Sequence, residues 1–269
     1  MSAQSYFQLL NPLLFSVFAA AFLALSLVSA KARAAAFLSA SYALGAGAFT
    51  IDFFRNAMPE IVGAFGSNAL YTATSATAVI GFCLRYDRAP PYRVLGAAAG
   101  LGMAFYAWLF FTFEGIAART LGINIVNGVL LSIGVVAVAH RIPARILDRV
   151  AFGCLALLAL QCFVRPALVF VVDRPTTVET YTQSTFFLTL HLVVGVVGVG
   201  LALTLLAAFA VETFQDHARR SSVDALTGVL NRRGFEEAAA PLLAAADATG
   251  AGVAVVVADL DRFKDVNEG

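Results

Sequence analysis

Charged side chains are scarce in this sequence. Of its 269 residues, 13% are Asp, Glu, Lys or Arg, whereas about 25% is usual for a soluble domain. Hydrophobic residues make up 60% of the chain, and the mean hydropathy is +0.82. On a globule of this size, so much apolar surface would leave large patches exposed to water. A single soluble domain is therefore excluded, and we expect much of the chain to lie in a lipid bilayer.

Three other shortages exclude further classes. Basic and acidic residues nearly balance at a formal net charge of +1, so the chain offers no clustered basic face for nucleic acid. The cysteines Cys83, Cys154 and Cys162 form no C-x-x-C pair, which favours simple packing over metal or disulfide chemistry. No basic residue precedes Lys31, so we expect no secretory signal.

Long apolar runs dominate the first 211 residues instead. A helix that crosses a bilayer needs about 20 mostly apolar residues. The sequence predicts an all-α polytopic membrane bundle of seven transmembrane helices, at residues 9–30, 34–54, 68–84, 94–113, 121–139, 150–172 and 184–211. The third run is the weakest because it is rich in Ser and Thr, whose hydroxyls can bond their own helix backbone.

Basic residues favour one orientation of this bundle. The connections after the first, third, fifth and seventh runs carry 10 Lys or Arg, and those after the other three carry 3. The positive-inside rule then predicts an external N-terminus and a cytoplasmic C-terminus. A retinal protein is excluded, because Lys31 and Lys264 are the only lysines and neither lies in the last run. Transport is disfavoured, because only Arg165 lies clearly inside a run.

Four ionisable residues are predicted to share one depth near the outer side: Asp52, Glu114, Arg165 and His191. In one interpretation they are structural: Arg165 snorkels or pairs with a carboxylate, and His191 bonds a neighbouring helix. In the other they line a sensory pocket open to the outside, where Arg165 holds an anionic or polar ligand of unknown identity.

The charges divide the chain into two parts. Residues 1–211 hold 19 of the 35 charged side chains, and the much shorter remainder holds 16. We therefore expect a membrane region at 1–211, a helical stalk at 212–223 and a cytoplasmic segment at 224–269. The stalk is predicted to be helical because it is polar and contains neither Gly nor Pro.

The cytoplasmic segment has the pattern of an α/β domain. Residues 235–246 have the apolar spacing of an amphipathic helix, and the β-branched run at 253–260 is typical of a buried strand. Asp259 ends that strand, where α/β sheets bind ligands and where a carboxylate can hold Mg²⁺. Lys264 offers a charge for phosphates and Asn267 an amide for a base edge. Acidic residues also end strands as solvated turns, so both readings stay open.

Two motifs of this segment closely resemble the opening of a GGDEF domain, the diguanylate cyclase family. They read D-A-L-T-G-V-L-N-R-R-G-F at 224–235 and V-A-D-L-D-R-F-K-D-V-N at 257–267. The resemblance implies an α/β fold in which two copies of the domain, in a homodimer, each bind GTP and jointly form cyclic di-GMP with Mg²⁺ or Mn²⁺. It also implies a bacterial inner membrane protein with its catalytic domain in the cytoplasm.

The resemblance also implies roles for individual residues. Asp259 and the carbonyl of Leu260 would ligate the metal, and the backbone N–H groups of Arg262 and Phe263 would bind phosphates. Lys264 would lie near the triphosphate, and Asn267 would recognise guanine.

The 269 residues stop short of the G-G-[DE]-E-F hairpin that names the family. We therefore expect a membrane-bound diguanylate cyclase controlled by its bundle, of which this chain alone, holding only the truncated start of the α/β domain, is inactive. Two alternatives stay open: a degenerate GGDEF domain that only binds nucleotide, and a membrane sensor or transport protein that acts through its helices.

Overall fold

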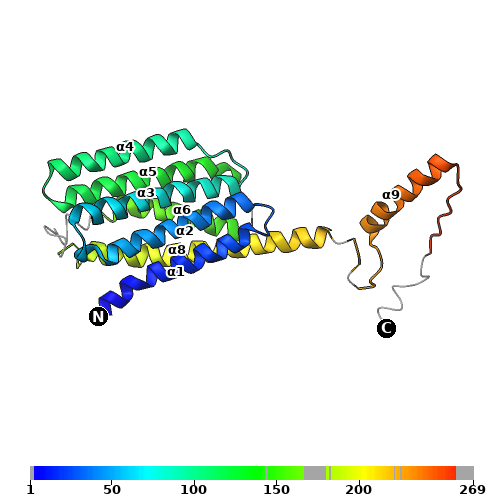
Figure 1. The fold of residues 1–269 in the computed structure, drawn as a ribbon, viewed down its shortest axis with the longest axis horizontal. Helices are drawn as coiled ribbons and strands as arrows, with labels where there is room; N and C mark the ends of the chain where they lie inside the picture. Colours follow the sequence, from blue (N-terminus) through cyan, green and yellow to red (C-terminus); the bar gives the residue numbers. More distant parts are fainter. Residues whose placement is uncertain are drawn as a thin grey trace. The chain divides into compact units, whose positions relative to one another are not determined.

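The chain folds into two compact units, Met1–Thr213 and Phe214–Gly269. The computed structural model, drawn in Figure 1, describes residues 3–142, 145–166, 180–181, 183–220, 222–224 and 226–258. In the first unit the described residues form long helices joined by short connections. Their bounds are α1 Ala3–Ser26, α2 Ala32–Phe53, α3 Glu60–Arg85, α4 Tyr92–Thr112, α5 Ile116–Val138, α6 Ile146–Val164 and α8 Thr185–Arg220. Two single 3₁₀ turns lie between them, η1 Arg55–Ala57 and η2 Ala139–Arg141.

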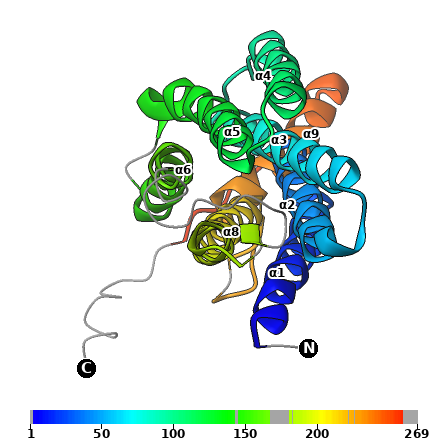
Figure 2. The same ribbon diagram turned by 90° about the vertical axis from the view of Figure 1, so that its left-hand side faces the viewer.

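These helices pack as a bundle, seen end-on in Figure 2. Helices α1, α2, α3, α5, α6 and α8 surround a common interior, and α4 lies outside this ring against α5 and α3. The interior is apolar and aromatic, with Phe22, Phe49, Phe82, Leu130 and Leu205 completely buried. Hydrogen bonds to main-chain carbonyls tie distant helices together, as where Tyr42 Oη donates to the carbonyl oxygen of Gly198 at 2.6 Å.

Six of the described helices are long and apolar enough to cross a membrane. The sequence predicted seven such runs, and the helix that falls short by composition is α3, the counterpart of the run at 68–84. The polar side chains that lower its hydropathy point inward, since Ser67, Asn68, Thr72 and Ser75 are all buried. Inside a bundle such groups can bond to neighbouring helices and to their own backbone.

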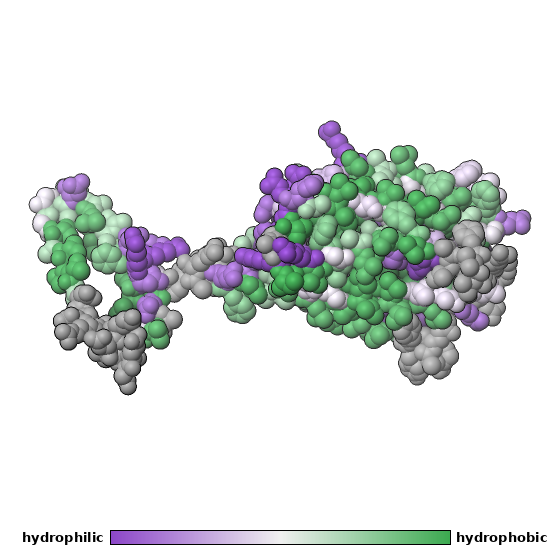
Figure 3. All heavy atoms as spheres, turned by 180° about the vertical axis from the view of Figure 1, so that it is seen from behind, coloured by the Kyte–Doolittle hydropathy of each residue, from purple (hydrophilic) through white to green (hydrophobic). Residues whose placement is uncertain are grey.

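The outer surface of the bundle is largely hydrophobic, as Figure 3 shows. Large apolar side chains on several helices are more than half exposed, among them Leu13 at 65%, Phe111 at 72% and Val136 at 74%. In water such a surface would drive aggregation, whereas hydrocarbon tails solvate it. The described helices therefore have the surface of a membrane protein.

One predicted helix end differs from that observed, and the last membrane helix continues into the predicted helical stalk. Helix α6 ends at Val164, whereas the sequence predicted a run to residue 172, of which 167–172 lie outside the described residues. Helix α8 begins at Thr185 and continues to Arg220, through most of the predicted stalk. The polar residues after Val211 thus prolong the last membrane helix without a break.

In the second unit the described residues form one helix, α9, Arg232–Thr249, which confirms the predicted amphipathic helix. The strand predicted at 253–260 does not form in its described part, 253–258. Val256 and Val257 are 90% and 89% exposed there. A strand needs backbone hydrogen bonds from a neighbouring strand, and the described residues supply no such neighbour, so the strand is absent over 253–258 and the α/β expectation is not confirmed by the described residues.

A cluster of buried charges joins three helices at the end of the bundle where α8 emerges. The guanidinium of Arg85, 1% exposed, donates to Asp148 of α6 at 2.9 Å and to both carboxylate oxygens of Glu212 of α8 at 3.2 Å. It also lies over the ring of Phe209 at 4.4 Å. Arg145 reaches Glu212 from the surface at 3.4 Å. The charge of Arg85 is thus compensated entirely by carboxylates from other helices.

Replacing Arg85 with Leu should destabilise the bundle strongly, because it leaves the carboxylate of Asp148, 1% exposed, buried without a counter-ion. Breaking a buried pair in this way costs on the order of 3–5 kcal/mol. Arg145→Leu is the matched control, since this arginine is half exposed and a surface ion pair contributes about 0–1 kcal/mol. Thermal unfolding in nanodiscs compares the two variants. If Arg85→Leu melts at the same temperature as Arg145→Leu and the unaltered chain, the cluster contributes nothing to stability.

Candidate functional site

In the second unit, a turn built on Asp224 follows the end of α8. One carboxylate oxygen, Oδ1, accepts hydrogen bonds from the backbone N–H of Leu226 at 3.1 Å and from the N–H and hydroxyl of Thr227 at 2.9 and 2.8 Å. These donors, Thr227 foremost, hold the pKa of the exposed Asp224 carboxyl below its usual value. Gly228 follows at a φ of +71°, which glycine adopts without strain. The first motif, D-A-L-T-G, is therefore a self-contained turn.

The next part of the motif starts helix α9. Asn231 is its N-cap, and its side-chain oxygen accepts from the N–H of Gly234 at 2.9 Å. A side chain at Gly234 would collide with the carbonyl of Ser222, so the turn closes tightly on the helix. Arg232 and Arg233 follow on the exposed first turn. The sequence D-x-L-T-G-x-x-N thus fixes how the chain enters α9.

The residues expected to bind nucleotide lie outside the described residues. They are Asp259, Leu260, Arg262, Phe263, Lys264 and Asn267. Within the part of the chain that the structure describes, no three His, Cys, Asp or Glu side chains gather as a metal would need. The assignment of metal and GTP ligands therefore stays a prediction from the sequence.

Of the four residues considered for a sensory pocket, two carboxylates lie apart. Asp52 is buried at the end of α2 and accepts from Arg55 Nη1 at 3.1 Å and from Tyr71 Oη at 2.9 Å. Glu114 is exposed in the connection between α4 and α5, where its backbone carbonyl accepts from Arg119 at 3.4 Å. Asp52 is thus an internal ion-pair partner, and Glu114 is a surface residue.

The other two residues, Arg165 and His191, are also buried. Arg165, at the end of α6, donates from Nε to Gln161 Oε1 at 2.9 Å and from Nη2 to Asn124 Oδ1 at 2.6 Å. His191 of α8 contacts the carbonyl of Phe187 through Nδ1 at 3.0 Å. Arg165 Nη1 and His191 Nε2 are buried and have no hydrogen-bond partner among the described residues. Each is therefore a donor or acceptor still open to a ligand or water.

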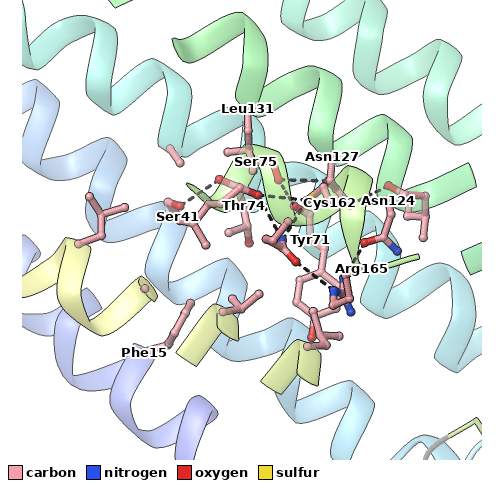
Figure 4. A pocket seen from close by; sticks show the side chains of 18 of the residues that line it. Phe15, Ser41, Tyr71, Thr74, Ser75, Asn124, Asn127, Leu131, Cys162 and Arg165 are labelled. Atoms are coloured by element: carbon pink, nitrogen blue, oxygen red, sulfur yellow. Dashed lines mark hydrogen bonds between the residues drawn. The ribbon is translucent and has the colours of Figure 1, made fainter. Parts of the chain in front are cut away.

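A cavity of about 140 Å³ lies inside the ring of helices. Residues of α1, α2, α3, α5, α6 and α8 line it, as does Tyr181, whereas Asp52, Glu114 and His191 do not. Figure 4 shows Arg165, Tyr71 and Asn124 close together in its wall, with Phe15 well away from them. Of the four candidates the structure thus brings only Arg165 to the cavity, with Asp52 one hydrogen bond behind Tyr71.

Sequence reasoning missed most of the polar wall. Three amide side chains of the wall lie in runs that the sequence analysis treated only as apolar spans: Asn124, Asn127 and Gln161. An amide inside such a run indicates a contact with another helix. Asn127 accepts from Ser75 of the hydroxyl-rich α3 at 3.1 Å. The sequence reasoning also missed the cluster around Arg85, because it treated this arginine only as a basic residue of a connection.

One family matches this chain. GGDEF, described as diguanylate cyclase, GGDEF domain, matches residues 221–269. No curated protein and no solved structure matches the chain. The match begins directly after the last residue of α8 and includes the Asp224 turn, the Asn231 cap and α9. Residues 221–269 of this chain thus match the GGDEF domain model, which is consistent with a member of the diguanylate cyclase family.

Proposed function

We propose that this chain is the membrane-bound, signal-receiving part of a diguanylate cyclase of the bacterial inner membrane. The bundle crosses the membrane, and the GGDEF domain that follows it makes cyclic di-GMP from two GTP molecules in the cytoplasm. The observation that carries this proposal is α8. It runs from Thr185 inside the bundle to Arg220, and the GGDEF match starts at the next residue.

The continuous helix supports a regulatory link between the two parts. Its apolar stretch, Thr185–Gln215, is long enough to cross a membrane, and its end leads into the Asp224 turn. A helix transmits displacement or rotation along its axis better than a flexible linker does. Because the reaction of this family needs two GGDEF domains facing each other, we propose that the bundle controls how two copies of the protein approach.

We propose that α3 crosses the membrane as a seventh span. Its 26 residues would reach about 39 Å at 1.5 Å per residue, beyond the roughly 30 Å of a hydrocarbon core. It packs against α2, α4 and α5 with its polar side chains buried. With an odd number of spans, the two ends of the bundle lie on opposite sides of the membrane. Because the basic connections favour the cytoplasm, the N-terminus would lie outside and the GGDEF domain inside, where GTP is present.

The chemistry proposed for the domain rests on the family. Asp259 and the Leu260 carbonyl would hold Mg²⁺ or Mn²⁺, which neutralises charge on the reacting phosphates when bound. Backbone N–H groups of Arg262 and Phe263, with Lys264, would hold the triphosphate, and Asn267 would select guanine by hydrogen bonds to its edge. The 269-residue chain contains no G-G-[DE]-E-F run, so we expect cyclase activity only with a complete GGDEF domain.

Reporter fusions test the proposed topology. Fusions at Asn56 and Gly115 should report the outside, and fusions at Asp87 and after Arg220 the cytoplasm. The reason is that an odd number of proposed crossings separates neighbouring sites: α3, then α4, then α5, α6 and α8 together. The pair Asn56 and Asp87 isolates α3, which is the only described helix between them. If these two sites report the same side, α3 does not cross.

Replacing Asp259 with Ala in a protein that carries this chain and a whole GGDEF domain should reduce cyclic di-GMP synthesis to below a tenth. The reason is the loss of charge neutralisation at the transferring phosphate. Asp247→Ala, on the same domain in α9, is the control and should retain full activity. Synthesis is measured from GTP in membranes, with protein amount checked by immunoblot. Activity above a tenth in Asp259→Ala would exclude this carboxylate as a metal ligand.

A further inference from the structure

The cavity inside the bundle has a positive charge in its wall, Arg165, that forms no ion pair with any residue the structure describes. Arg165 is 7% exposed, and its polar partners among the described residues are the neutral amides of Asn124 and Gln161. Its guanidinium also lies 4.1 Å from the centre of the Phe186 ring. Nη1 keeps a proton without an acceptor. A buried cation is costly unless an anion compensates it, so the site is electrostatically prepared for an anion.

Among the described residues, the carboxylates considered for this site have other partners or lie outside the cavity. Asp52, the nearest candidate from the sequence, shares its oxygens between Arg55 and Tyr71, and no ion pair with Arg165 forms in the described part of the chain. Glu114 is exposed and outside the cavity. This contrasts with Arg85, which two carboxylates neutralise. Among the described residues no carboxylate pairs with Arg165, so its guanidinium is available to the anionic group of a ligand.

The rest of the cavity wall determines the polarity and size of the remaining part of the ligand. Most of it is apolar, formed by side chains of α1, α2, α3, α5, α6 and α8 such as Phe15, Leu38, Phe82, Leu131, Val194 and Leu201. Its volume of about 140 Å³ compares with the roughly 150 Å³ of an engineered apolar cavity that binds benzene. The site thus suits an apolar body of about one aromatic ring or a chain of similar size.

We propose that this cavity binds a small monocarboxylic acid, with its carboxylate on Arg165 and its apolar body among the side chains of the interior. Arg165 Nη1 would donate to the carboxylate, and the hydroxyl of Thr74, also without a partner among the described residues, lines the same space. As the signal of the proposed cyclase this ligand rests on the proposed function, but its binding does not depend on catalysis.

Benzoate is the probe that tests the site. The 269-residue chain, in nanodiscs of zwitterionic phosphatidylcholine, is equilibrated with radiolabelled benzoate, and binding to empty nanodiscs is subtracted. We expect saturable binding that benzamide, its neutral analogue, displaces at least tenfold less effectively. Binding no greater than that of empty nanodiscs, or equal displacement by benzamide, would overturn the proposal.

Arg165→Gln should weaken benzoate binding at least tenfold, because it removes the charge and keeps a hydrogen-bonding side chain. Arg119→Gln is the matched control: Arg119 is also mostly buried, but it pairs with Glu60 and does not line the cavity. Its affinity should stay within twofold of the unaltered chain. Unchanged binding in Arg165→Gln, or equal loss in both variants, contradicts the assignment.

A cavity-filling variant keeps the test decisive if Arg165→Gln does not fold. Ala78 lines the cavity, and Ala78→Leu fills it while keeping Arg165, so it should also weaken benzoate binding at least tenfold. Size-exclusion and thermal unfolding verify that each variant is folded. Full binding in folded Ala78→Leu would place benzoate elsewhere and overturn the proposal.

Chain length separates a small soluble acid from a lipid-derived one. Hexanoate should displace benzoate, and dodecanoate, whose chain exceeds the cavity, should do so at least tenfold less effectively. Stronger displacement by dodecanoate would overturn the proposed size. If benzoate does not bind, the proposed cyclase function is not affected. If the complete protein has no cyclase activity, the measurement of benzoate binding is equally unaffected.

Discussion

The need to compensate buried charge inside an apolar bundle governs this structure. Where α8 emerges, the guanidinium of Arg85 is neutralised by Asp148 of α6 and Glu212 of α8. At the other end, the carboxylate of Asp52 accepts from Arg55 and Tyr71. In hydrocarbon such groups cannot turn to water for partners. Each cluster therefore fixes how the ends of neighbouring helices meet.

Against this background Arg165 differs from the other buried arginines. Arg85 and Arg55 meet carboxylates, whereas Arg165 meets two neutral amides and an aromatic ring in the described part of the chain. It also lines the cavity, whose wall includes residues of α8 such as Leu190 and Val194. An uncompensated charge beside an apolar cavity is the pattern of a ligand site.

Helix α8 connects these features to the GGDEF segment. It contributes to the cavity wall, carries Glu212 of the charge cluster and continues to Arg220, where the family match begins. A change in the cavity that moved α8 would also act on the Arg85–Glu212 contact. The described part of the predicted stalk is helical, as a continuation of α8 to Arg220.

The sequence by itself determined the features that depend on local composition or local backbone geometry. Apolar runs located the helices, and the motif that begins at Asp224 encodes its own turn and the Asn231 cap through contacts a few residues apart. Hydropathy is a poor guide to a helix that buries polar side chains, as α3 does, because it does not say which neighbouring group bonds to a hydroxyl. It also predicted a strand at 253–260, which does not form over 253–258 because strand pairing is a long-range interaction. Only the tertiary structure decided that Arg85 has its counter-ions 63 and 127 residues away, and that Arg165 bonds to the amide of Asn124, 41 residues away, because packing alone brings such distant residues together.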